Sequence, residues 1–105
     1  MVKRRFDLDA TVSTDGPGQV RTALRNLLGD PAVKPGENAG EFIVKREMEG
    51  ESAKDLNRAL LSSLRRVEKK TRLRATWTAQ DGAVYKFFDY VLKKELKPAR
   101  RGAQN

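Results

Sequence analysis

The sequence contains neither cysteine nor histidine. Without cysteine there can be no disulfide, no thiolate nucleophile and no sulfur-ligated metal site. Without histidine the chain lacks the commonest protein metal ligand and the usual general base near neutral pH. We therefore expect a protein that is not an enzyme and that holds no metal and no cofactor.

Long apolar runs are also missing. No segment approaches the roughly 20 apolar residues that a membrane-spanning helix needs. The basic N-terminus is followed at once by Asp7 and Asp9, so it lacks the apolar stretch of a signal peptide. From these two features we expect a cytoplasmic protein with no membrane partner.

The basic charge, in contrast, is abundant and one-sided. Residues 1–64 carry ten Lys or Arg and ten Asp or Glu, so this part is neutral. Residues 65–105 carry twelve basic residues against four acidic ones, which accounts for the whole net charge of +8. A one-sided excess of this kind creates a directed field that attracts polyanions. It indicates nucleic acid or an acidic protein as a partner.

Hydrophobic periodicity predicts the secondary structure. Strict alternation predicts strands over residues 4–13 and 72–79, and a less regular alternation predicts one over 41–49. Spacings of three and four residues predict amphipathic helices from Pro17 to Gly29 and from Ser52 to about Lys70. Asp81-Gly82 predicts a tight turn into a last strand over 84–93, whereas residues 29–40 read as an irregular loop.

The predicted fold is α+β. The order β-α-β-α-β-β predicts a two-layer sandwich, in which both helices cover one face of a mixed four-stranded sheet. Residues 1–93 would form a single compact domain, and residues 94–105 a flexible basic C-terminal tail. This element order over residues 4–93 resembles that of the C-terminal domain of bacterial translation initiation factor three, a small ribosome-binding module. The resemblance, which is one of topology, implies an RNA partner.

The last hairpin carries the first candidate site. If Asp81-Gly82 is a two-residue turn, Tyr85 and Phe87 lie opposite Thr78 and Thr76, on the face away from the helices. Exposed aromatic side chains on a basic sheet are typical of RNA-binding surfaces that stack bases. A three-residue loop would instead present three neighbouring side chains on that face: Lys86, Phe88 and Tyr90.

Two further basic surfaces are candidates. One is a stripe on the outer face of the second helix, formed by Lys54, Arg58, Arg65 and Lys69. The other is the C-terminal arm, formed by Lys93, Lys94, Lys97, Arg100 and Arg101. Charged residues on a helix face or in a tail can also be solvated residues that only keep a protein soluble. For each of the two surfaces, binding and solubility therefore both stay open as interpretations.

The function we expect is non-enzymatic nucleic-acid binding, to RNA more than to DNA. Phosphates would be neutralised by the basic arm and by Lys69, Lys70, Arg72 and Arg74, and bases would stack on Tyr85 and Phe87. The alternative is a protein-interaction or structural module, with a homodimer formed through the open sheet face as one form of it.

Overall fold

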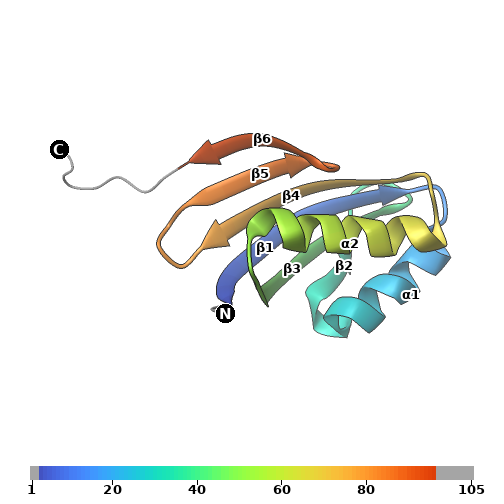
Figure 1. Ribbon diagram of the computed structural model, residues 1–105. Coiled ribbons are helices and arrows are strands. Elements are labelled where there is room, and N and C mark those ends of the chain that lie inside the picture. Colours follow the sequence, from blue (N-terminus) through green and yellow to red (C-terminus); the bar gives the residue numbers. More distant parts are fainter. Residues whose placement is uncertain (1–2, 97–105) are drawn as a thin grey trace.

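Six strands and two α-helices make up residues 3–96, the part of the chain described by a computed structural model (Figure 1). The elements in chain order are β1 (Arg4–Thr14), α1 (Pro17–Leu28), a 3₁₀ turn (Asp30–Ala32), β2 (Val33–Pro35), β3 (Glu41–Gly50), α2 (Ala53–Val67), β4 (Thr71–Ala79), β5 (Val84–Phe88) and β6 (Val91–Leu96). The strands form one sheet in the order β2-β3-β1-β4-β5-β6, and each neighbouring pair is antiparallel. The α+β class is confirmed.

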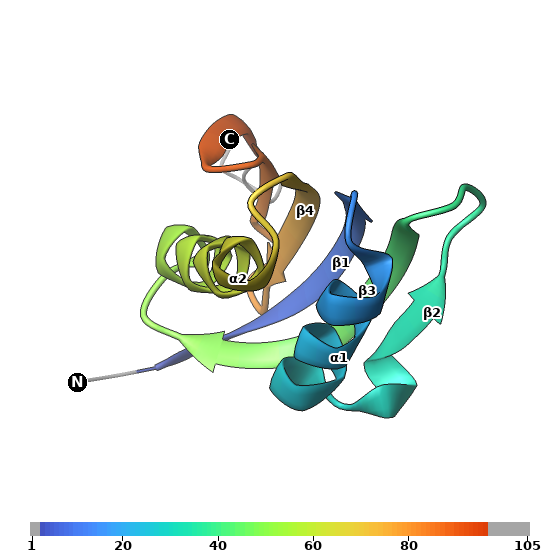
Figure 2. The same ribbon diagram turned by 90° about the vertical axis from the view of Figure 1, so that its right-hand side faces the viewer.

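Both helices lie on the same face of the sheet, which curves around them (Figure 2). The alternation in β1 explains this arrangement, because every second residue from Phe6 to Val12 is buried beneath the helices. The helices contribute buried leucines and valine to the same core: Val20, Leu24, Leu28, Leu60, Leu61 and Leu64. The opposite face of the sheet, which we call the open face, is left uncovered (Figure 1).

The predicted helix boundaries have clear local causes. Pro17 opens α1, and Gly29 follows its end with φ of +90°. Ser52 caps α2, its side chain accepting a hydrogen bond from the amide of Asp55 at 3.0 Å. The second helix ends at Val67, three residues before the predicted end.

The prediction of a four-stranded mixed sheet is wrong, and β2 is the main reason. This short strand lies in the region predicted to be an irregular loop, and it pairs antiparallel with β3. The additional reversal turns the chain before β3, so that β3 runs antiparallel to β1. Strands β3 and β4 do run in the same direction, but β1 lies between them and pairs with both. No parallel pair therefore forms in the described sheet.

The predicted last strand is divided into two. Its pairing with β4 ends at Phe88, Asp89 takes a positive φ of 56°, and the chain reverses into β6. Strand β6 extends to Leu96 and so includes the start of the predicted tail. With β2 and β6 added, the observed element order differs from the one that resembled the initiation-factor domain.

Within residues 3–96 neither helix combines the length and the apolar character needed to cross a bilayer.

Candidate functional site

Charge is unevenly distributed over the open face. Alternate residues of β4, β5 and β6 bring four cations to one side of it: Arg72, Arg74, Lys86 and Lys94. The opposite corner, where β1 and β3 pair, presents Asp7, Glu47 and Glu49 beside Arg5. Four of the twelve basic residues that follow residue 64 thus lie on one face of three adjacent strands.

The register of the β4–β5 hairpin decides which aromatic side chains reach this face. The connection is a three-residue loop, Gln80–Gly82, in which Gly82 has φ of +94° and the Asp81 side chain accepts from the Ala83 amide at 3.0 Å. Arg74 therefore pairs with Phe88, and Thr76 with Lys86. The predicted two-residue turn is wrong, and the alternative register is correct for these two partners.

Tyr85 and Phe87, predicted to be stacking platforms, lie on the helix side of the sheet instead. Phe87 is 4% exposed within the core. Tyr85 packs against that core with its ring edge-on to Phe6, the ring centroids 6.3 Å apart. A one-residue change in register sends every side chain of a strand to the other face, which explains the error. Neither ring is available to stack on a ligand at the open face.

Phe88 takes their place, with two guanidinium groups against its ring. The Cζ atom of Arg72 lies 5.3 Å from the ring centroid and that of Arg74 lies 5.2 Å from it. Arg72 is also fixed by Asp89, whose Oδ2 accepts from its Nε at 3.2 Å. Arg74 makes no ion pair with any residue in the described range. One arginine is thus held in place, while the other has its charge free for a ligand.

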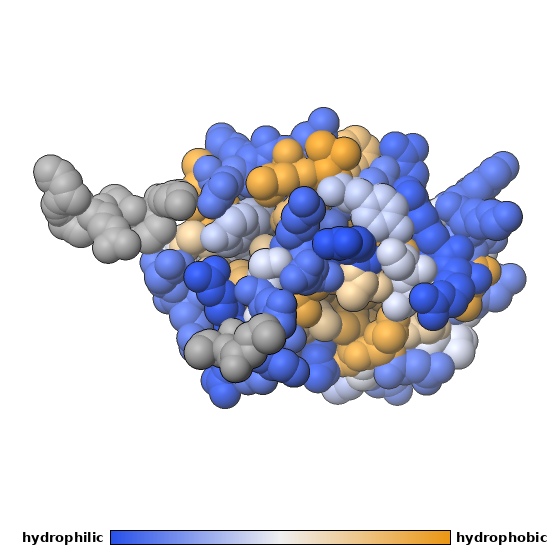
Figure 3. Space-filling model, viewed as in Figure 1, coloured by the Kyte–Doolittle hydropathy of each residue, from blue (hydrophilic) through white to orange (hydrophobic). Residues whose placement is uncertain are grey.

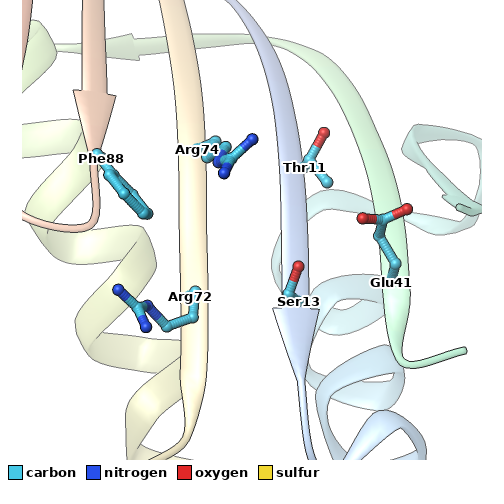
Figure 4. A pocket seen from close by; sticks show the side chains of 6 residues that line it. All are labelled: Thr11, Ser13, Glu41, Arg72, Arg74 and Phe88. Atoms are coloured by element: carbon cyan, nitrogen blue, oxygen red, sulfur yellow. The ribbon is translucent and has the colours of Figure 1, made fainter. Parts of the chain in front are cut away.

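A shallow depression of about 260 Å³ lies beside this cluster. Figure 4 shows the side chains that line it, contributed by four strands: Thr11, Ser13, Glu41, Arg72, Arg74 and Phe88. Glu41 stands at its rim and accepts hydrogen bonds from the amides of Glu37 and Asn38. The other five side chains offer hydroxyl groups, guanidinium groups and an aromatic ring.

Two neighbouring depressions share residues with the first and extend it. One of about 470 Å³ includes Ser13, Lys70 and Arg72, and one of about 450 Å³ includes Thr11, Arg74, Thr76, Lys86, Phe88 and Lys93. The three depressions adjoin one another through these shared residues, and we call them together the basic groove. Its cations and ring are Lys70, Arg72, Arg74, Lys86, Phe88 and Lys93, and its hydroxyl groups come from Thr11, Ser13 and Thr76. Three carboxylates also line it, those of Asp9, Asp15 and Glu41, so its cations outnumber its acids by five to three.

The remaining predicted positions are scattered. Lys69 is exposed in the turn before β4, and Lys94 pairs with Lys86 at the margin of the basic groove. Tyr90, the third residue of the alternative register, lies on the helix side, where its hydroxyl is 3.1 Å from the Ser62 hydroxyl. Lys97, Arg100 and Arg101 lie outside the described residues.

The predicted stripe on α2 is not a continuous cationic surface. Arg65 is turned towards the sheet: its Nε donates to the Thr71 carbonyl at 2.9 Å, its Nη2 lies 3.5 Å from Asp89, and its Cζ lies 5.2 Å from the Tyr90 ring centroid. Arg58 pairs with Asp55 at 3.1 Å. Lys69 lies beyond the end of the helix. Of the four predicted stripe residues, Lys54 is therefore the only one that is an exposed cation of α2 and forms no ion pair with a described residue.

Thr76 was predicted to lie on the open face, but the hydroxyl groups of Thr11 and Ser13 were not part of the predicted site, although the signal existed. Thr11 and Ser13 occupy the polar positions of the strictly alternating first strand, and Thr76 those of the fourth. What no local pattern disclosed was that β1 and β4 would be neighbours, with Thr11 opposite Arg74 and Ser13 opposite Arg72.

Comparison of the chain with protein-family models, with curated proteins and with solved structures found no match. Within residues 3–96 no cluster of three or more acidic side chains is arranged to hold a metal ion. The basic groove, with its ring and hydroxyl groups, is the candidate site.

Proposed function

We propose that this protein is a nucleic-acid-binding module that binds RNA in preference to DNA through the basic groove. The observation that carries the proposal is the placement of Phe88 against Arg72 and Arg74 on an open, hydroxyl-lined sheet face. One surface thus carries groups that complement both parts of a nucleic acid. The guanidinium groups complement the anionic phosphates, and the aromatic ring complements the flat bases.

Phosphate neutralisation would come from the five groove cations. None of Lys70, Arg74, Lys86 and Lys93 forms an ion pair with a described residue, so their charge is available to a ligand. Each phosphate contact releases condensed counterions, which favours binding at low salt. Arg72 keeps its fixed position through Asp89 and would serve as the anchored contact.

Base stacking would use the Phe88 cluster. Bases stack on aromatic rings and on guanidinium planes, and each such contact contributes about 1–3 kcal/mol. Two guanidinium groups already lie over the ring, so a base would stack on a guanidinium plane or take the place of one of them on the ring.

The preference for RNA rests on the hydroxyl groups. Thr11, Ser13 and Thr76 line the same depressions as the arginines. A hydroxyl group both donates and accepts hydrogen bonds, as the ribose 2′-hydroxyl does, and that group distinguishes RNA from DNA.

Fluorescence anisotropy with labelled RNA and DNA at two salt concentrations tests the proposal. The informative variant is Arg74→Ala/Lys86→Ala, and its matched control is Lys54→Ala/Arg66→Ala, which removes the same charge from exposed positions on α2. We expect the groove variant to bind at least about tenfold more weakly and to lose about 1.4–1.8 from the log–log salt slope, at 0.7–0.9 per contact. Equal weakening by the two variants would reduce the effect to overall charge, and no binding at low salt would overturn the proposal.

A protein-interaction module remains the second candidate, favoured by β6. This edge strand exposes Val91, Leu92 and Leu96 by 57%, 45% and 42%, and apolar atoms gather over it at the upper edge of the molecule in Figure 3. Dimerisation through Tyr85 and Phe87 on the open face is not available, because both side chains pack on the helix side. Sedimentation velocity would support this candidate if the protein forms a stable dimer that Leu92→Lys disrupts.

A further inference from the structure

We infer, on the basis of the proposed function, that the ligand is a short single-stranded segment whose path starts along β4 and turns across β5 towards β6. The path turns where the charge of the open face changes from positive to negative, in front of an acidic corner formed by Asp7, Glu47 and Glu49.

The first part of the path follows the alternate residues of β4. Successive side chains on one face of a strand are about 7 Å apart, which is close to the distance between neighbouring phosphates of an extended nucleic-acid strand. Lys70, Arg72 and Arg74 follow this spacing at the upstream end of β4 and line the connected depressions. They would contact consecutive phosphates.

Beyond Arg74 the charge pattern along β4 changes. The next open-face residues, Thr76 and Thr78, are uncharged, and their β1 partners are Asp9 and Asp7. Asp7 in turn pairs with Glu47, next to Glu49. Arg5 offsets part of this charge, with its Nε 3.1 Å from Glu49 and its Nη1 4.0 Å from Glu47. Lys45, the β3 partner of Asp9, offsets another part. A phosphate chain that continued straight along β4 would meet net negative charge.

The groove offers another direction at the same point. Its second depression extends from Arg74 and Thr76 to Lys86 and Lys93, across β5. Asp9 also lines this depression, but three cations line it too, so its net charge is positive. The β5–β6 pairing slips between Lys86 and Phe87, so that Lys93 is the additional residue of a bulge. Bulges redirect side chains, and here Lys93 contributes to the groove from an edge strand.

The dimensions set the length of the site. The path covers about 14 Å along β4 and about 10 Å across two inter-strand spacings, which accommodates roughly three to four extended nucleotides. The stacking cluster lies at the bend, since Phe88 contacts Arg74 and lines the depressions on both sides of it.

A duplex does not suit this surface. Base faces inside a duplex are stacked on one another, so Phe88 and its guanidinium neighbours would reach them only after a base is extruded. A path that bends within so few nucleotides also suits a flexible strand better than a stiff duplex. Single strands should therefore bind more tightly than duplexes at equal salt.

The test is a length series of single-stranded oligouridylates, from about two to about ten nucleotides, with an RNA duplex of about ten base pairs as comparison. We expect the affinity to rise steeply up to about four nucleotides and only slightly beyond, with the duplex at least about tenfold weaker. A duplex that binds as tightly as the single strand, or an affinity that keeps rising steeply with length, would overturn the inference. If no oligonucleotide binds at low salt, the proposed function itself fails, which is a different result.

A charge-removing variant tests the bend separately. Asp7→Asn/Glu47→Gln removes two charges from the acidic corner, whereas the control Asp30→Asn/Asp55→Asn removes two charges from exposed, ion-paired positions in the 3₁₀ turn and in α2, outside the sheet. We expect the first variant to bind the longest oligonucleotide at least about threefold more tightly than the control does, with both equal on the shortest bound one. An equal gain at every length in both variants would show that the corner does not limit the path.

Discussion

Asp89 satisfies both backbone hydrogen-bonding groups of Leu73. Its amide donates to the Leu73 carbonyl at 2.7 Å, and its carboxylate Oδ1 accepts from the Leu73 amide at 3.0 Å. The side chain thus replaces the next residue of a regular β-ladder, at the point where β5 ends and the chain reverses. The same carboxylate holds Arg72 at 3.2 Å and so links the turn to the candidate site.

Asp89→Ala should destabilise the protein by about 2–4 kcal/mol. The change leaves the Leu73 amide without its acceptor, which costs about 1–3 kcal/mol, and it places alanine at a φ of 56°, which costs about 1 kcal/mol more. Asp89→Asn keeps an acceptor oxygen and tolerates this conformation, so it should cost less than half as much. Urea unfolding followed by circular dichroism measures both, and equal losses would show that the charge on Asp89 matters more than its hydrogen bond.

Asn57 joins the core to the same turn. Its Oδ1 accepts from the indole Nε1 of Trp77 at 3.2 Å, and its Nδ2 donates to the Asp89 carbonyl at 2.7 Å, while the residue itself is 1% exposed. Asn57→Ala would leave two polar groups unsatisfied, and we expect a loss of about 2–4 kcal/mol. Ser62→Ala removes an exposed hydrogen bond of the same helix and should cost under about 0.5 kcal/mol. Thermal unfolding with Trp77 fluorescence as the probe would contradict this account if the two variants melt together.

Adjacent phenylalanines should respond in opposite ways to substitution. Phe87→Ala opens a cavity in the core and should destabilise the protein by about 3–5 kcal/mol. Phe88→Ala lies on the open face and should leave stability within about 1 kcal/mol, while weakening RNA binding by about 1–3 kcal/mol. Unfolding and anisotropy on the same samples make the comparison. A large stability loss for Phe88→Ala with none for Phe87→Ala would show that the hairpin register is the other one.

Replacing glycine by alanine should change stability in opposite directions at two positions, Gly40 and Gly18. A Cβ atom on Gly40, where φ is +76°, would lie 2.5 Å from the Thr14 carbonyl oxygen, so Gly40→Ala should destabilise the protein by at least about 2 kcal/mol. A Cβ atom on Gly18, in the first turn of α1, would meet nothing within 4 Å. Gly18→Ala should therefore stabilise the protein, by up to about 1 kcal/mol. Their melting temperatures should move in opposite directions, and a shared direction would contradict the placement of Gly40 against β1.

The candidate site was predicted in part. The sequence placed Arg72 and Arg74 on the polar side of a strand, because alternation within one strand is a local property. It did not select Phe88 over Phe87, because that choice depends on whether the loop has two or three residues. It also did not show that Arg65 would be turned inward by Asp89, a partner 24 positions away in the chain.

The sequence by itself determined the local periods of this protein: the alternation of β1 and β4, the two amphipathic helices, the caps at Ser52 and Gly29, and the concentration of charge after residue 64. These features can be read from residues that are close together in the sequence, without knowledge of long-range contacts. Only the tertiary structure decided the sheet order, the antiparallel direction of β3, the reversal at Asp89 and the gathering of cations into one groove. The physical reason is that strand partners are chosen by long-range burial and by chain reversals, and a three-residue strand such as β2 is enough to change the direction of the strand that follows it.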